Sequence, residues 1–213
     1  MTEPDFLRDT RSSYDTIATA YDEQFAGWID RKPVDRAVLS LFAELVRAKG
    51  NIEVVDVGSG PGYIARHLKS LGLDVFGIDL SREMVELARR RYPDIRFEEG
   101  SMTALDLPEG GLGGICAWYS TIHVPLDLLP GVFAGFRRAL VPGGHLALGF
   151  QSGDEITHYD EGFGHAVSLD FYRRSPDLVA GLLTDAGFEV YARAEREADA
   201  GEKTRHGYLI ARS

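Results

Sequence analysis

The sequence predicts an α/β fold built on a doubly wound, mostly parallel sheet with helices on both faces. Short runs of β-branched and other apolar residues alternate along the chain with segments of helical periodicity, which is the pattern of repeated strand–helix–strand units. Glycine or proline stands at many of the junctions between these segments. The 213 residues, 44% of them hydrophobic and 26% charged, are enough for a single domain with its own core.

The first 50 residues are expected to form two helices. Apolar and aromatic positions recur at helical spacing from Tyr14 to Phe25 and again from Val34 to Val46. Pro33 suits the first turn of the second helix, because its missing N–H has no partner there in any case. Gly50 is expected to end that helix.

Residues 51–151 contain the alternating strand and helix segments that predict the parallel sheet. Ser81 can cap a helix, and Tyr92-Pro93 is expected to stop it. Pro142-Gly143-Gly144 is expected to form a turn before the fifth strand. The expected strands cover 52–57, 74–78, 95–98, 114–118 and 145–150, and the expected helices cover 63–71, 81–91 and 128–140.

Residues 152–213 are less regular. The polar, glycine-containing segment 151–164 is expected to be a long loop, and 167–172 a short extended segment. Ser175-Pro176-Asp177 opens a helix that Gly187 closes. Two last strands, over 188–194 and 205–211, are expected to pair as a hairpin.

Charge and composition narrow the functional classes. Acidic residues outnumber Lys and Arg by 33 to 23, which gives a net charge of −10 and disfavours nucleic-acid binding. The basic run Arg89-Arg90-Arg91 lies at a helix end, where cations complement the helix dipole. The chain has a single cysteine, Cys116, which fits a reducing compartment. The segment from Met1 to Asp5 is acidic, unlike a signal peptide, and no apolar run reaches the about 20 residues that a membrane span requires. We therefore expect a cytoplasmic protein that binds no membrane. No histidine or acid spacing matches a metal-site signature, so no metal is expected.

A glycine-rich turn is the strongest functional signal. The segment Val54-Val55-Asp56-Val57-Gly58-Ser59-Gly60-Pro61-Gly62 joins a buried strand to a helix, and such a turn lies at the ligand-binding edge of a doubly wound sheet. Dinucleotide enzymes carry G-x-G-x-x-G, but here the third place falls on Tyr63. The phosphate loop G-x-x-x-x-G-K-[ST] is also absent from the sequence.

The segment instead resembles motif I of the class I S-adenosylmethionine (SAM)-dependent methyltransferases. Asp79 ends the second strand, where a carboxylate can accept hydrogen bonds from both hydroxyls of a ribose. Ser101 stands where many members of that family have an aspartate near the adenine, and Met102 beside it can pack on a purine face. The resemblance covers about residues 52–150.

The resemblance implies a Rossmann-like sheet of seven strands, mostly parallel with the last strand antiparallel, within a single domain over 1–213. It implies that residues 1–50 cover the site, 51–151 form the SAM-binding core, and 152–213 supply a substrate-side loop, a helix and the terminal hairpin. The cofactor is expected to be SAM, with S-adenosylhomocysteine (SAH) as its product. The cofactor-binding residues are then expected to be Tyr14, Tyr21, Asp56, Gly58, Ser59, Gly60, Gly62, Asp79, Leu80, Ser101, Met102 and Tyr119.

His123 is the candidate catalytic base. It follows the fourth strand at the ligand end of the sheet, and imidazole suits proton transfer near neutral pH. The alternative is that His123 only stabilises the turn in which it lies. Tyr14 and Tyr21 share one helix face, and they either contact the cofactor and substrate or form part of a core-facing stripe.

The predicted activity is methyl transfer to a small-molecule acceptor by in-line displacement. A SAM-binding module without catalysis and a nicotinamide-dependent oxidoreductase are the alternatives. Nucleic-acid methylation is disfavoured, since Ala117-Trp118-Tyr119-Ser120 replaces the Asn/Asp-Pro-Pro-Tyr type of motif after the fourth strand. The sequence leaves open the acceptor atom (O, N or C) and whether the protein is a monomer or a homodimer.

Overall fold

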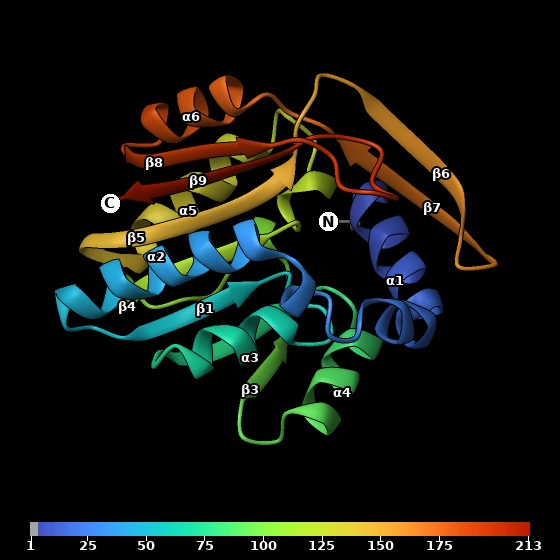
Figure 1. The fold of residues 1–213 in the computed structure, drawn as a ribbon, viewed down its shortest axis with the longest axis horizontal. Helices are drawn as coiled ribbons and strands as arrows, with labels where there is room; N and C mark the ends of the chain where they lie inside the picture. The colour runs from blue at the N-terminus through green and yellow to red at the C-terminus, as the bar shows by residue number, and fades with distance from the viewer. Residues whose placement is uncertain (1–3) are drawn as a thin grey trace.

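A computed structural model describes residues 4–213 and is organised around one seven-stranded sheet (Figure 1). Residues 1–3 of the acidic amino-terminal segment lie outside the described part. The strand order is β3 (Arg96–Glu99), β2 (Asp74–Asp79), β1 (Glu53–Val57), β4 (Leu112–Trp118), β5 (Leu140–Gln151), β9 (His206–Arg212) and β8 (Glu189–Arg196). Neighbours from β3 to β5 pair in parallel, whereas β9 runs antiparallel to both β5 and β8. The mostly parallel seven-stranded sheet predicted from the sequence is confirmed.

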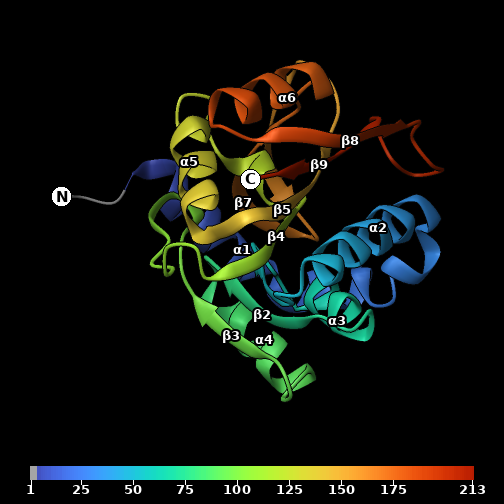
Figure 2. The same cartoon turned by 90° about the vertical axis from the view of Figure 1, so that its left-hand side faces the viewer.

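Helices cover both faces of this sheet (Figure 2). Every residue of β4 is buried, as expected for a central parallel strand with helices on both sides. Two apolar clusters, one on each face, hold the layers together. One face carries α2 (Pro33–Lys49), α3 (Tyr63–Ser70) and α4 (Arg82–Arg91), and the other carries α5 (Leu129–Ala139) and α6 (Pro176–Asp185).

The helix boundaries follow from the local sequence. Pro33 is the first residue of α2, and Gly50 ends that helix with a left-handed φ of 88°. The Ser81 hydroxyl accepts a hydrogen bond from the Met84 N–H at 3.1 Å and so caps α4. Ser175 caps α6 in the same way through the Leu178 N–H. These caps were all predicted from the sequence.

The prediction of a long loop over 151–164 is wrong. A strand, β6 (Ile156–Gly162), pairs there with β7 (His165–Tyr172) in a two-stranded antiparallel sheet apart from the main one. Phe163 and Gly164, with φ of 54° and 76°, form the tight turn between the two strands. Polar residues hid this strand, because much of β6 is exposed.

The turn expected at Pro142-Gly143-Gly144 is instead a bulged stretch within β5. The pairing register of β5 on β4 shifts between Leu112 and Gly114, and Gly143 has a φ of 77°. The strand therefore begins at Leu140, directly after α5, rather than at His145.

The amino-terminal helix α1 (Asp5–Phe25) and the β6–β7 hairpin together cover the carboxyl ends of the central strands (Figure 1). They are joined through Ser13, whose hydroxyl accepts a hydrogen bond from the Ser168 N–H at 2.9 Å and donates one to the Ser168 carbonyl oxygen at 3.3 Å. We call α1 and the hairpin the cap. Three short 3-10 turns complete the fold: η1 (Ile29–Arg31), η2 (Met102–Ala104) and η3 (Thr121–His123).

No helix among residues 4–213 combines the length and the apolar character that crossing a bilayer requires.

Candidate active site

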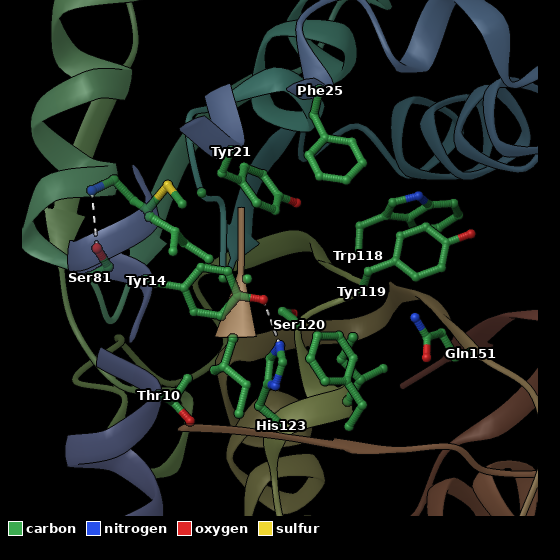
Figure 3. A pocket seen from close by; sticks show the side chains of 18 of the residues that line it. Thr10, Tyr14, Tyr21, Phe25, Ser81, Trp118, Tyr119, Ser120, His123 and Gln151 are labelled. Carbon is green, nitrogen blue, oxygen red and sulfur yellow. Dashed lines mark hydrogen bonds between the residues drawn. The ribbon is translucent and has the colours of Figure 1, made fainter. Parts of the chain in front are cut away.

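A cavity of about 950 Å³ lies between the cap and the carboxyl ends of β1, β2 and β4. This is near the upper end of the usual size of small-molecule sites, about 300–1,000 Å³. Its walls come from α1, the turns after β1, β2 and β4, the hairpin and the β8–β9 loop. Apolar and aromatic side chains dominate these walls (Figure 3).

The glycine-rich turn after β1 forms one end of the cavity. The N–H groups of Gly58 and Ser59 donate to the carbonyl oxygen of Ile78, at 2.7 and 3.1 Å, and hold the turn against β2. A Cβ at Gly58 would lie 2.2 Å from the Ser120 Cβ, so this glycine allows close packing. At Gly60, with φ of 50°, a Cβ would meet no heavy atom within 4 Å. Gly60 thus leaves open space beside the backbone, as a cradle for a ligand would.

Asp79 lies on the wall next to this cradle. Its carboxylate accepts hydrogen bonds from the Gly60 N–H at 2.7 Å and from the Ser81 N–H at 2.8 Å. Burial raises the pKa of Asp79 to about 6, so the group is mainly ionised at neutral pH. Each oxygen keeps a further lone pair, so the carboxylate can also accept protons from ligand hydroxyls.

Asp56 and Gly62 are the predicted cofactor residues that do not line the cavity. Asp56 is 1% exposed, and neither carboxylate oxygen has a hydrogen-bond partner among the described residues. Burial and the nearby Asp79 charge raise the pKa of Asp56 to about 8. A Cβ at Gly62 would clash with the Phe97 ring at 2.7 Å, so Gly62 serves packing at the start of α3.

The other predicted residues lie together on the cavity wall. Ser101 and Met102 follow β3, and Leu80 follows β2. The Ser101 hydroxyl is already engaged, since it caps η2 through the Thr103 N–H at 3.3 Å and lies 2.8 Å from the Thr103 hydroxyl. Ser101 therefore both lines the cavity and caps η2.

His123 and Tyr14 form a hydrogen-bonded pair inside the cavity (Figure 3). The Nδ1 of His123 lies 2.9 Å from the carbonyl oxygen of Asp170, which can only accept, so Nδ1 carries the proton. The Nε2 atom, 2.8 Å from the Tyr14 hydroxyl, is then the acceptor and Tyr14 the donor. Burial lowers the pKa of His123 to about 4, so the imidazole is neutral at pH 7.

Aromatic rings from the cap extend the wall beyond this pair. Tyr21 packs edge-on against Tyr14 and against Phe163 at the hairpin turn, with centroids 6.0 Å apart in each case. Phe25 also meets Phe163, at 6.2 Å. Tyr21 and Tyr14 share one face of α1, as the sequence predicts, and Tyr159 and Phe163 of the hairpin line the same cavity.

Tyr119 forms the opposite wall and carries a backbone φ of 53°, which is unusual for a residue with a Cβ. Its hydroxyl donates to Asp35 at 3.0 Å and lies 2.8 Å from the His206 Nδ1 and 3.1 Å from the Tyr208 hydroxyl. Sequence reasoning missed this buried network. A signal existed, since Asp35 shares one apolar helix face with Leu39, Phe42 and Val46, all fully buried.

The fold and the cavity are those of an α/β protein with a ligand site at the carboxyl edge of its sheet, where the Gly60 backbone borders open space and the Asp79 carboxylate can accept further hydrogen bonds. A family model described as a methyltransferase domain matches residues 54–144. The chain belongs to the class I SAM-dependent methyltransferases, whose cofactor is SAM.

Individual relatives support this membership. The chain is 28% identical over 177 residues to a malonyl-[acyl-carrier protein] O-methyltransferase of Pectobacterium atrosepticum, covering 82% of this chain and 67% of the relative. It is 30% identical over 171 residues to an S-adenosyl-L-methionine-dependent Diels-Alderase, iliD, of Neonectria sp., covering 73% and 67%. It spans only about half the length of some other curated relatives. The solved DhpI-SAM-HEP complex is 25% identical, covers 100% of both chains and has a TM-score of 0.74.

Proposed function

We propose that this protein transfers the methyl group of SAM to an oxygen atom of a small molecule with an apolar body, by in-line displacement. The observation that carries the proposal is the Tyr14–His123 pair, which shares one cavity with the glycine cradle and Asp79. The relative named as an O-methyltransferase supports an oxygen acceptor. The aromatic walls formed by Tyr21, Phe25 and Tyr119 support an apolar body.

The residues present fit the cofactor. The open space at Gly60 leaves room for it, and the Asp79 carboxylate is available for ribose hydroxyls. Leu80, Ser101 and Met102 would surround the adenine end. SAM supplies an electrophilic methyl group, and the electrons of the broken carbon–sulfur bond leave with SAH.

His123 would take the acceptor's proton, through Tyr14. With Nδ1–H donated to the Asp170 carbonyl, the free lone pair of the ring is on Nε2, which faces the Tyr14 hydroxyl. The acceptor's proton would pass to the Tyr14 oxygen while the Tyr14 proton passes to Nε2. Holding the reacting groups in place contributes roughly 7–11 kcal/mol in well-oriented systems. Proton transfer adds about 10²–10⁴-fold.

The experiment that tests the proposal follows SAM consumption. The purified protein is incubated with SAM carrying a ¹³C-methyl group and a panel of small phenols, enols and carboxylic acids, and mass spectrometry detects SAH and the labelled product. We expect equal amounts of SAH and of an O-methylated product for at least one apolar acceptor. Labelled product bearing the methyl group only on nitrogen or carbon would contradict the oxygen acceptor.

A second candidate function is favoured by the relative named as a SAM-dependent Diels-Alderase. A protein of that kind would bind SAM in the same cradle but convert its substrate without consuming the methyl group. The two candidates separate in the same experiment. Substrate conversion that requires SAM yet releases no SAH would favour the second.

A further inference from the structure

Arg174 is a buried cation directly behind the turn that carries His123. It follows β7 and is 5% exposed. Its Nη1 donates to the carbonyl oxygen of Thr121 at 3.2 Å and to that of Tyr172 at 3.4 Å, and its Nη2 donates to the carbonyl oxygen of Val124. Thr121 and Val124 bracket His123, so one guanidinium group holds both ends of the turn.

The charge of Arg174 has no acidic partner among the salt bridges of residues 4–213. A buried guanidinium normally requires a carboxylate, because taking a cation out of water costs several kcal/mol. Burial lowers the pKa of Arg174 to about 10, which still leaves it protonated at neutral pH. The side chain therefore places a full positive charge behind the site and compensates it only with carbonyl dipoles and the Tyr172 ring, whose centroid lies 5.1 Å away.

The titratable groups facing His123 come from three segments. Tyr14 on α1 donates to Nε2, Asp170 on β7 accepts from Nδ1 through its backbone carbonyl, and Arg174 lies behind the turn. The Asp170 carboxylate favours a charged imidazole and Arg174 opposes it. The Asp170 carboxylate also bonds His158 Nδ1 at 2.7 Å, so it is held on the outer side of the hairpin.

We propose that Arg174 is a positioning residue of the methyl-transfer site, which fixes the turn from Thr121 to Val124 and so holds the His123 ring with Nε2 turned toward Tyr14. The charge of Arg174 adds to the effect of burial in disfavouring the imidazolium. The inference rests on the proposed role of His123 in proton transfer. Arg174 does not line the cavity, so it acts through the turn it holds, in which Ile122, His123 and Val124 line the cavity. A neutral ring keeps its lone pair available at mildly acidic pH, and it releases a captured proton readily after each turnover.

The test measures the titration and tautomer of His123 by ¹H–¹⁵N NMR of the imidazole nitrogens, assigned with a His123→Gln variant. Arg174→Gln removes the charge and keeps hydrogen-bond donors. Arg174→Lys keeps the charge but loses the planar group whose two nitrogens reach the Thr121 and Val124 carbonyls together. Removing the charge relieves a penalty on the imidazolium, so in Arg174→Gln the pKa of His123 should rise by roughly one unit. In Arg174→Lys it should stay near the wild-type value.

Asp170→Asn is the matched control, because its carboxylate is 42% exposed and its backbone carbonyl is retained. It should shift the pKa of His123 downward, opposite to Arg174→Gln. If Arg174→Gln does not fold, Arg174→Lys still decides. In that case the tautomer of His123 gives the answer: Arg174→Lys loses its hold on one of the two ends of the turn and should measurably populate the Nε2-protonated form, whereas a wild-type tautomer in Arg174→Lys would overturn the proposal. An unchanged His123 titration in every folded variant, or a rise in Arg174→Lys, overturns it.

Steady-state kinetics gives a second readout. Arg174→Gln should move the acid limb of the kcat profile to higher pH by the same roughly one unit, with KM for SAM within about twofold, because Arg174 touches neither ligand. A purely structural role would instead lower the active fraction measured by SAM titration and leave the pH profile in place. Full turnover in His123→Ala would overturn the proposed role of His123 as the proton acceptor. The NMR titration is independent of that role, because it reports only how Arg174 affects the His123 ring.

Discussion

The two ends of the cavity are built in different ways. The proposed cofactor end uses the turns after β1, β2 and β3, which follow one another along residues 58–102 and rest on parallel strands. The acceptor end joins side chains from α1, η3, the β6–β7 hairpin and the β8–β9 loop, with Tyr14 and Phe163 nearly 150 residues apart. The first end depends on backbone geometry and the second on long-range packing. The two ends should therefore respond differently to substitution.

The largest expected effect belongs to the acceptor end. His123→Ala should lower kcat by about 10²–10⁴-fold, since it removes the proton acceptor, while the Kd for SAM stays within about twofold. Steady-state kinetics and calorimetric SAM titration check the two halves of this statement. Tyr14→Phe keeps the ring and removes the hydroxyl that relays the proton, so it should also lower kcat and leave the Kd for SAM nearly unchanged. A parallel loss of SAM affinity in His123→Ala would break the division between the two ends.

The next effect belongs to the cofactor end. Asp79→Ala should weaken SAM binding by about 1.5–3 kcal/mol, or roughly 10–150-fold, because it removes a charged acceptor. Calorimetric titration measures this directly. Circular dichroism checks that Asp79→Ala keeps the wild-type fold. If it does, a Kd for SAM equal to that of the wild type would refute the contact between Asp79 and the ribose.

The pH dependence of cofactor binding sharpens the same point. The pKa of Asp79 is raised to about 6, so the carboxylate loses its charge as the pH falls through 6. SAM affinity should therefore decline by up to about tenfold per pH unit below that value. Asp79→Asn should flatten this dependence. A wild-type affinity that is constant from pH 8 to pH 5 would contradict the assignment.

The smallest expected effect concerns Asp56, which is buried beneath the glycine-rich turn. The folded-state pKa of Asp56, about 8, lies above the ordinary value of 3.8, so the group lowers the free energy of unfolding progressively as the pH rises from about 4 to about 8. Asp56→Asn should raise the Tm of the cofactor-free protein by a few degrees at pH 9 and by little at pH 5. Thermal unfolding monitored at both pH values provides the test. A gain that is equal at both would show that the charge is not responsible.

The difference between the two ends also explains what the sequence could predict. That Gly58, Gly60 and Asp79 line one cavity could be predicted because a strand, a turn and a helix lie next to one another in the chain, and their spacing reports the local backbone. His123 was placed at the ligand edge for the same reason. Ser81, Pro33 and Gly50 set helix ends through purely local hydrogen bonding.

The remaining features depend on contacts that no local pattern reports. The β6 strand was missed because its polar residues face solvent, and only pairing with β7 shows it to be a strand. Arg174 reads as an ordinary surface cation until the carbonyl groups of Thr121 and Val124 are placed beside it. Asp56 matched the family motif, yet its depth below the turn follows from the sheet rather than from the sequence.

The contacts of α1 have a consequence for the order in which the chain can be completed during synthesis. Tyr14 is made before its partner His123, which contacts Asp170 and whose turn is held by Arg174, about 160 residues after Tyr14. The strands that bear the cofactor cradle, β1 to β4, are complete well before then. A nascent chain can thus complete the glycine turn and Asp79 while α1 still lacks its docking surface, and the turn that carries His123 gains its last contacts only when residues 170–174 have been made.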